Sequence, residues 1–172
     1  FHPDRETMKL TGKVTIFGKK TGRPSQRLTF HQKDLTITNA SIARRDKKGQ
    51  QAFAVSRIST HKTFDEVRLH SDALLYAGEY EVNFEFHTKI TDAMHGVYPC
   101  YYEIDGKKQA LIASQFESHH AREAFPCIDE PEAKATFDVT LTTESGVTVL
   151  GNMPIRSVRT EGDQLVTSFD TT

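Results

Sequence analysis

Apolar and polar residues alternate along most of this chain, a pattern typical of strands that bury one face. The clearest run is Tyr80, Val82, Phe84 and Phe86, with polar residues between them. Residues 135–141 repeat the alternation directly after a segment that is unlike a strand. Shorter strand candidates lie at residues 14–17, 27–31, 35–37, 53–58, 67–69, 111–116, 148–153 and 165–169. The pattern therefore predicts a protein built mainly from short strands.

Turn-forming residues separate these runs. Asp105-Gly106 lies between residues 101–104 and 109–112 and predicts a hairpin. One helical turn is expected at residues 121–125, ended by Pro126. No long amphipathic helix separates the strands, which favours an all-β fold of two or more curved antiparallel sheets, a β-sandwich or saddle-like domain, over an α/β fold. The length suits one domain that spans residues 1–172.

The charge of the chain is balanced, which bears on its partners. It holds 22 Lys plus Arg and 23 Asp plus Glu, a formal net charge of −1. A broad electrostatic surface for nucleic acid or an anionic membrane is therefore not expected, and we predict neither partner. The main basic stretch, Arg44, Arg45, Lys47 and Lys48, is interrupted by Asp46 and is interpreted as a solvated loop between strands.

Neither a membrane anchor nor a disulfide framework is indicated. No apolar stretch is long enough to span a bilayer, and the first residues do not resemble a signal peptide, so we expect a soluble chain and predict a cytoplasmic location. The two cysteines, Cys100 and Cys127, are far apart and outside any C-x-x-C pattern. We expect them to be reduced, buried thiols rather than disulfide partners or zinc ligands.

The most specific pattern lies in residues 114–141, SQFESHHAREAFPCIDEPEAKATFDVTL. Two prolines, an arginine and several carboxylates crowd a connection between two predicted strands, which indicates an ordered loop held by internal ion pairs. Thirteen positions form one colinear motif: Gln115, Glu117, Ala121, Arg122, Phe125, Pro126, Cys127, Asp129, Glu130, Pro131, Lys134, Ala135 and Phe137. This motif resembles that of zinc aminopeptidases of the aminopeptidase N and puromycin-sensitive aminopeptidase family, and here it lies in what would be their N-terminal domain.

The resemblance covers nearly the whole chain from about residue 10 onward. Further matches are Asp34-Leu35, Gly78, Tyr80, Asp92, Gly96, Tyr98 and Asn152-Met153-Pro154. Three departures stand out. Pro99 and Cys100 replace a usual Arg-Ser, Ile128 replaces a common aromatic residue, and His119-His120 fills a variable stretch. None of them affects the Gln and Glu of the motif, so they bear on the subfamily rather than on the family.

The resemblance implies roles for two residues. Glu117 would reach into a neighbouring active-site cleft and bind the free α-ammonium group of a peptide, and Gln115 would line the pocket for the first side chain. The family commonly has a cis peptide bond after this glutamate, here Glu117-Ser118. A structural role in the loop, without a catalytic step, is expected for Arg122, Asp129, Glu130 and Lys134.

The chemistry itself would belong to another part of the parent protein. The family's zinc motif H-E-x-x-H and its Gly-x-Met-Glu-Asn motif do not occur in these 172 residues. By the resemblance, zinc is the cofactor of the full-length enzyme, and it would be bound by a catalytic domain that follows in the same chain. We therefore expect no catalytic residue and no bound metal in this domain. Its partners would be that catalytic domain and peptides with a free amino terminus.

Three alternatives remain open at this point. His119-His120, near Glu117 and Glu123, could suggest a metal site, but adjacent histidines rarely point the same way in a strand or helix. The parent could be a non-catalytic relative of the same fold that serves in protein assembly. A generic β-sandwich binding module would require nothing of Gln115 or Glu117, and without the motif both would be interpreted as ordinary solvent-facing side chains.

Overall fold

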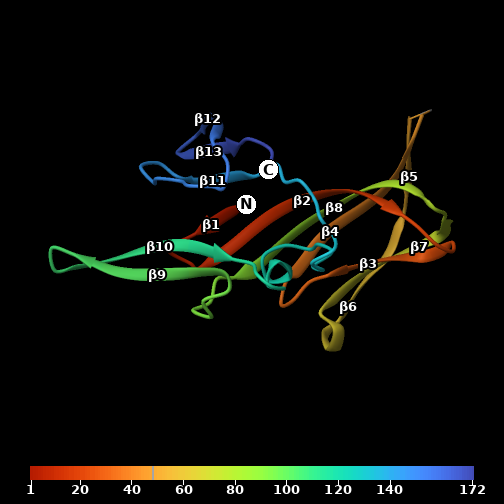
Figure 1. Cartoon of the computed structure of the whole chain (residues 1–172), viewed down its shortest axis with the longest axis horizontal. Coiled ribbons are helices and arrows are strands. Elements are labelled where there is room, and N and C mark those ends of the chain that lie inside the picture. Colours follow the sequence, from red (N-terminus) through yellow and green to blue (C-terminus); the bar gives the residue numbers. More distant parts are fainter. Residues whose placement is uncertain (48) are drawn as a thin grey trace.

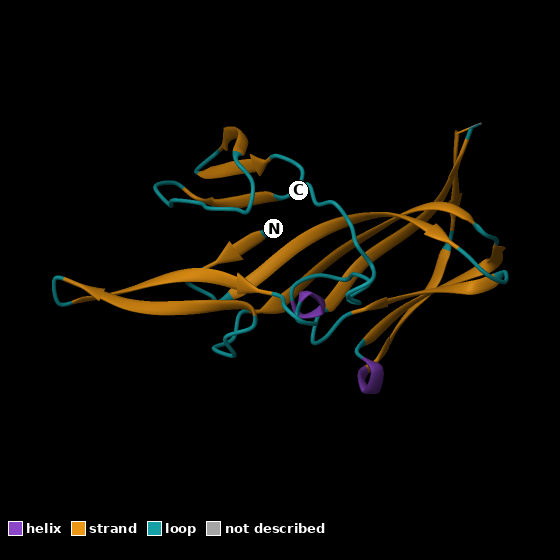
Figure 2. Ribbon diagram, viewed as in Figure 1, coloured by secondary structure: helices purple, strands orange, loops and turns teal. Residues whose placement is uncertain are grey.

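The computed structural model describes residues 1–47 and 49–172. The strands are β1 His2–Asp4, β2 Lys9–Lys20, β3 Ser25–His31, β4 Thr36–Asp46, β5 Gly49–Phe53, β6 Val55–His61, β7 Glu66–Leu75, β8 Gly78–Lys89, β9 Gly96–Ile104, β10 Lys107–Gln115, β11 Thr140–Glu144, β12 Ile155–Glu161 and β13 Gln164–Phe169. The described part of the chain also holds two short 3-10 turns, η1 Lys62–Phe64 and η2 Ala121–Glu123 (Figure 2). The turn predicted at residues 121–125 is confirmed, and η1 was not predicted.

The strands form several antiparallel sheets, as predicted. The largest has the order β1-β2-β8-β4-β5, and a three-stranded sheet has the order β3-β7-β6. A second three-stranded sheet, β11-β13-β12, and the two-stranded pair β10-β9 complete the fold (Figure 1). The all-β class is therefore confirmed.

The core lies between the five-stranded sheet and the sheet β3-β7-β6. In β8 the alternation predicted from the sequence is observed, because Tyr80, Val82, Phe84 and Phe86 are all buried. The ring of Phe84 meets that of Phe30 from β3 edge to face, with centroids 5.2 Å apart. Burial of these large apolar side chains is the main force that holds the two sheets together.

The strand predicted at residues 135–141 is wrong over residues 135–139. Strand β11 begins only at Thr140, although Phe137 and Val139 continue the alternation. Their carbonyl groups accept hydrogen bonds from Thr172 at 3.1 Å and Phe169 at 3.0 Å, at and beyond the end of β13. These two bonds form at the last residue of β13 and beyond it, where regular strand pairing ends. Residues 135–139 are therefore extended but are not part of the β11–β13 ladder.

The strand predicted at residues 148–153 is also wrong, and the strand lies at β12 instead. Pro154, which has no N–H to donate, separates the predicted segment from β12. Gly151 lies so close to Phe169 that an added Cβ would meet the ring at 2.7 Å. Every residue of β12 is exposed, so no alternation marks it in the sequence. The prediction at residues 53–58 likewise crosses a break at Ala54, between β5 and β6.

The basic stretch is only partly a loop. Arg44 and Arg45 lie in β4, which pairs with β8 on one side and β5 on the other. This pairing carries β4 past the end of its apolar pattern, so the prediction of a loop is wrong for these two residues. The guanidinium of Arg45 lies 5.1 Å from the centre of the Phe17 ring. Lys48 lies outside the described residues.

The predicted hairpin is confirmed as β9–β10. Asp105 and Gly106 at its tip have positive φ angles of 51° and 73°, as a tight two-residue turn between antiparallel strands requires. The hairpin extends away from the other sheets, at the left of Figure 1. Its outer half is exposed, including Tyr101, Ile104 and Leu111. In the described part of the chain, neither helical turn has the length or apolarity to cross a membrane.

Candidate functional site

The motif residues lie in the long connection between β10 and β11. Its middle is anchored in the core, because Ala124, Phe125 and Pro126 are buried. The ring of Phe125 packs edge to face against Phe116 at 5.8 Å and Phe137 at 6.3 Å. The connection is thus an ordered part of the fold, as its composition predicted.

Main-chain hydrogen bonds also tie this connection to the end of β3. His31 and Cys127 exchange two of them, at 2.7 and 3.2 Å, and Lys33 N–H donates to the carbonyl of Arg122 at 2.8 Å.

Both cysteines are free and partly buried. Burial, together with the nearby carboxylate of Asp129, raises the pKa of the Cys127 thiol to about 12, so this thiol is neutral at physiological pH.

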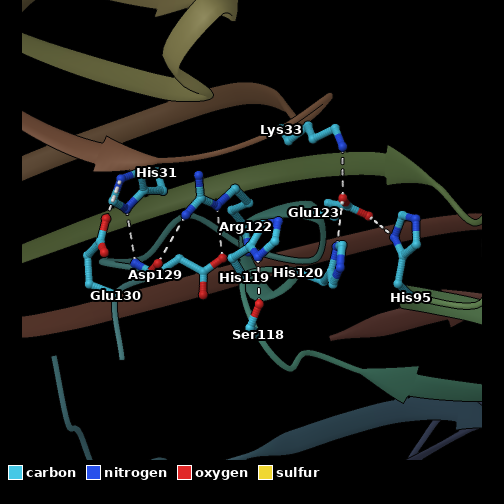
Figure 3. Close-up of polar contacts among 10 residues, drawn as sticks. All are labelled: His31, Lys33, His95, Ser118, His119, His120, Arg122, Glu123, Asp129 and Glu130. Atoms are coloured by element: carbon cyan, nitrogen blue, oxygen red, sulfur yellow. Dashed lines mark hydrogen bonds and ion pairs between the residues drawn. The ribbon is translucent and has the colours of Figure 1, made fainter. Parts of the chain in front are cut away.

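An ion pair closes the loop around this strand end. Arg122 Nε donates to Asp129 Oδ2 at 2.9 Å, and its Nη2 donates to the Asp129 carbonyl at 3.0 Å. The N–H of Asp129 in turn donates to His31 Nδ1 at 3.0 Å, and His31 Nε2 lies 3.5 Å from Glu130 Oε1 (Figure 3). Lys134 is exposed and forms no ion pair with another described residue.

Gln115 and Glu117 lie where β10 ends. Gln115 is the last residue of β10 and pairs with Gly96 of β9, whereas Glu117 lies beyond the strand in a turn. Their spacing of two residues would suggest two side chains on one face of a strand, but the two residues do not share a strand. Both side chains are exposed, and neither forms a hydrogen bond or ion pair with the rest of the described chain. The peptide bond Glu117-Ser118 is cis, as predicted.

Glu123 lies at the centre of a polar cluster beside that turn. Lys33 Nζ lies 3.0 Å and His120 Nδ1 3.1 Å from its Oε1, and His95 Nδ1 lies 2.6 Å from its Oε2 (Figure 3). Burial alone would raise the pKa of Glu123, but the hydrogen bonds from His120, Lys33 and His95 outweigh it and lower the pKa. The carboxylate is therefore ionised at neutral pH.

The histidines of this cluster are stacked. His119 and His120 have ring centres 4.7 Å apart, contrary to the expectation that neighbours point apart, and His95 stacks on His120 at 4.2 Å. Their nitrogens nevertheless serve different partners, since His119 Nδ1 bonds to the hydroxyl of Ser118 at 2.7 Å. The stacking was not predictable because residue 95 is far from residue 120 in the sequence.

The ligand atoms of His95, His120 and Glu123 lie within 4.8 Å of one another, which raises the question of a metal ion. The arrangement does not fit one. An imidazole binds a metal along a lone pair in the ring plane, and the planes of His95 and His120 are stacked at only 23°, so the two lone pairs do not converge. The ammonium group of Lys33 also occupies the same carboxylate. The cluster is satisfied as hydrogen-bonded ion pairs.

Comparison with known proteins identifies the family. A model of the peptidase M1 N-terminal domain matches residues 1–172. Aminopeptidase N of Lactococcus lactis subsp. lactis (strain IL1403) is 39% identical over 88% of this chain and 16% of its own length. Aminopeptidase N of Lactobacillus delbrueckii subsp. lactis is 34% identical over 90% of this chain and 18% of its own length. Aminopeptidase M1 of Arabidopsis thaliana is 29% identical over 98% and 19%.

The chain thus spans less than a fifth of these relatives. The family model and the aminopeptidase N relatives agree with the motif in residues 114–141 and with the all-β fold. A generic β-sandwich module of another family is excluded by this agreement. The chain belongs to the peptidase M1 N-terminal domain family.

Proposed function

We propose that this domain is the substrate-anchoring part of a zinc aminopeptidase that releases N-terminal residues from peptides. The observation that carries the proposal is the exposed carboxylate of Glu117. It is without a partner among the described residues and projects from a turn whose base is fixed in the core. Glu117 binds the α-ammonium group of the peptide, and Gln115, at the end of β10, contacts the first side chain through a neutral amide.

Electrostatics support this role for Glu117. A carboxylate and an ammonium group about 4 Å apart attract each other by roughly 4 kcal/mol at an effective dielectric constant of about 20, before desolvation is subtracted. An internal peptide bond offers no such cation, so a fixed negative charge in the cleft favours cleavage at the chain end. The carboxylate has no competing cation within the described part of the domain, which leaves it available for the substrate.

The catalytic part is a separate domain of the same parent chain, and this domain packs against it. When bound there, zinc supplies the activated water for hydrolysis, and no step of that chemistry is assigned to residues of this chain. The outer half of β9–β10 offers a docking surface, because Tyr102, Ile104 and Leu111 are exposed on one face of a separate two-stranded hairpin. Two-stranded hairpins are marginally stable alone, and clustered exposed apolar side chains are typical of interfaces.

The location in the cell is a smaller part of the proposal. Cys100 and Cys127 are free rather than paired, which fits a reducing compartment. We retain the cytoplasm as the expected location.

The test is the Glu117→Gln variant of the full-length parent enzyme, which removes the charge and keeps the shape. If about half of the Coulomb attraction is realised, kcat/KM for peptides with a free amino terminus falls by about 30-fold, while N-acetylated substrates are unaffected. Glu132→Gln is the matched control, because Glu132 is an exposed glutamate of the same connection. Unchanged kcat/KM on free-amine substrates would refute the role of Glu117, and a parent that hydrolyses no peptide would favour the protein-assembly alternative.

A further inference from the structure

The Glu123 cluster connects three segments that are distant in the sequence. Lys33 follows β3, His95 immediately precedes β9, and His120 precedes η2. The side chain of Glu123 is only 16% exposed. Figure 3 shows all three side chains converging on this one carboxylate. Hydrogen bonds of this charge-assisted kind are about twice as strong as neutral ones.

One partner of Glu123 fixes the turn that holds Glu117. The N–H of His120 donates to the carbonyl of Phe116 at 2.9 Å, which closes a turn of five residues around Glu117. The side chain of the same His120 bonds to Glu123 at 3.1 Å. The backbone and the side chain of His120 are thus held at the same time, which links Glu123 to the Glu117 turn.

The other contacts of Glu123 reach the strand that ends in Gln115. His95 is joined to Gly96, and Gly96 pairs with Gln115 across β9 and β10. Gly96 has a φ of +68°, and a Cβ added there would lie 3.2 Å from both Cβ and Oε2 of Glu123. Glu123 therefore packs directly on the backbone that aligns Gln115. Glu123 thus contacts both His120, in the turn of Glu117, and Gly96, the strand partner of Gln115.

We propose that Glu123 is a positioning residue, which fixes the carboxylate of Glu117 relative to Gln115 so that the amine and the first side chain of a peptide bind together. This inference rests on the proposed function. Without Glu123, His95 and His120 lose their shared acceptor, and the stacking of their rings is the side-chain contact between them that remains. A displacement of about 1 Å in a positioning group can reduce a rate by up to about 100-fold.

The experiment uses the full-length parent enzyme with Glu123→Ala, Glu123→Gln, and each combined with Glu117→Gln. For peptides with a free amino terminus we expect Glu123→Ala to raise KM by about tenfold with a smaller change in kcat, because the binding of the ground state is impaired first. Glu123→Gln, which keeps an acceptor oxygen, restores part of the loss. In the Glu117→Gln background either change has less than about a twofold effect, because the group that it positions is already disabled.

A matched control separates positioning from general stability. Glu66→Ala removes an ion pair with Arg68 in β7, where the glutamate side chain is 21% exposed, and should leave KM unchanged. If Glu123→Ala does not fold, the same comparison is made with Glu123→Gln. Losses that add to those of Glu117→Gln would overturn the inference, as would an unchanged KM in a folded Glu123 variant. Either result leaves the proposed function intact if Glu117→Gln alone is impaired. A silent Glu117→Gln variant would instead refute the proposed function, and the inference with it.

Discussion

Breaking the ion pair between Arg122 and Asp129 should destabilise the domain far more than breaking a surface pair of similar length. Asp129→Asn keeps the volume of the side chain and removes its charge, which leaves the guanidinium of Arg122 without a counter-ion. The two side chains are only 13% and 10% exposed, and Arg122 makes three hydrogen bonds to Asp129. The pair therefore behaves as a nearly buried one.

The size of the effect follows from this burial. Removing one partner of a buried pair costs about 3–5 kcal/mol, and the residual exposure favours the lower end, about 3 kcal/mol. For a chain of this length each kcal/mol lowers Tm by about 2–4 °C, so we expect a decrease of about 6–12 °C. The comparison is Glu161→Gln, which breaks a pair with Arg159 at 2.7 Å whose side chains are 60% and 58% exposed. Such a surface pair contributes less than about 1 kcal/mol.

Urea and thermal unfolding of the two variants, followed by circular dichroism, measure both effects. The free energy of unfolding should fall by about 3 kcal/mol for Asp129→Asn and by less than about 1 kcal/mol for Glu161→Gln. Equal losses in the two variants would show that burial does not decide the strength of these pairs. The reasoning about the loop would then be wrong.

Two further predictions concern ionisable groups. Cys127 should resist iodoacetamide at pH 8 in the folded chain, because burial raises the pKa of its thiol to about 12. The thiol should react once urea unfolds the chain, and peptide mass mapping measures the labelling. Rapid labelling of the folded chain would contradict the prediction. The pKa of Glu123 lies below its usual 4.5, because hydrogen bonds from His120, Lys33 and His95 favour the ionised carboxylate. The ionised form therefore stabilises the fold fully above pH 4.5. This contribution is lost as the pH falls through the lower pKa of the folded state. The stability difference between the parent and Glu123→Gln should accordingly shrink in urea titrations as the pH falls below about 4.5, and a difference that grows over that range would refute the assignment.

The fold was predictable where one face of a strand is buried. The alternation of Tyr80 to Phe86 marks β8 because every second side chain enters the core. β12 has no buried face, and its Ile155 and Val158 are both exposed, so the sequence carries no signal for it. The alternation through Phe137 misled the prediction because hydrogen bonding, rather than side-chain pattern, decides where a ladder begins.

The candidate site, like the fold, could be predicted from the sequence only in part. Gln115 and Glu117 could be named from the motif, and the charged residues of the loop were rightly expected to form an internal pair, as Arg122 and Asp129 do. The cluster around Glu123 could not be predicted, because Lys33 and His95 approach it only through the tertiary fold. Contacts between residues so far apart in sequence leave no local pattern.

Gln115 and Glu117 lie on either side of the end of β10 and differ in how much sequence change around them they tolerate. Gln115 is aligned by pairing between main chains, which survives replacement of most side chains around it. Glu117, two residues later, lies in a turn that is bonded through His120 to Glu123, which in turn contacts Lys33 and His95 from distant segments. During divergence within the family, the position of residue 117 is therefore more sensitive to changes in distant side chains than the position of residue 115 is.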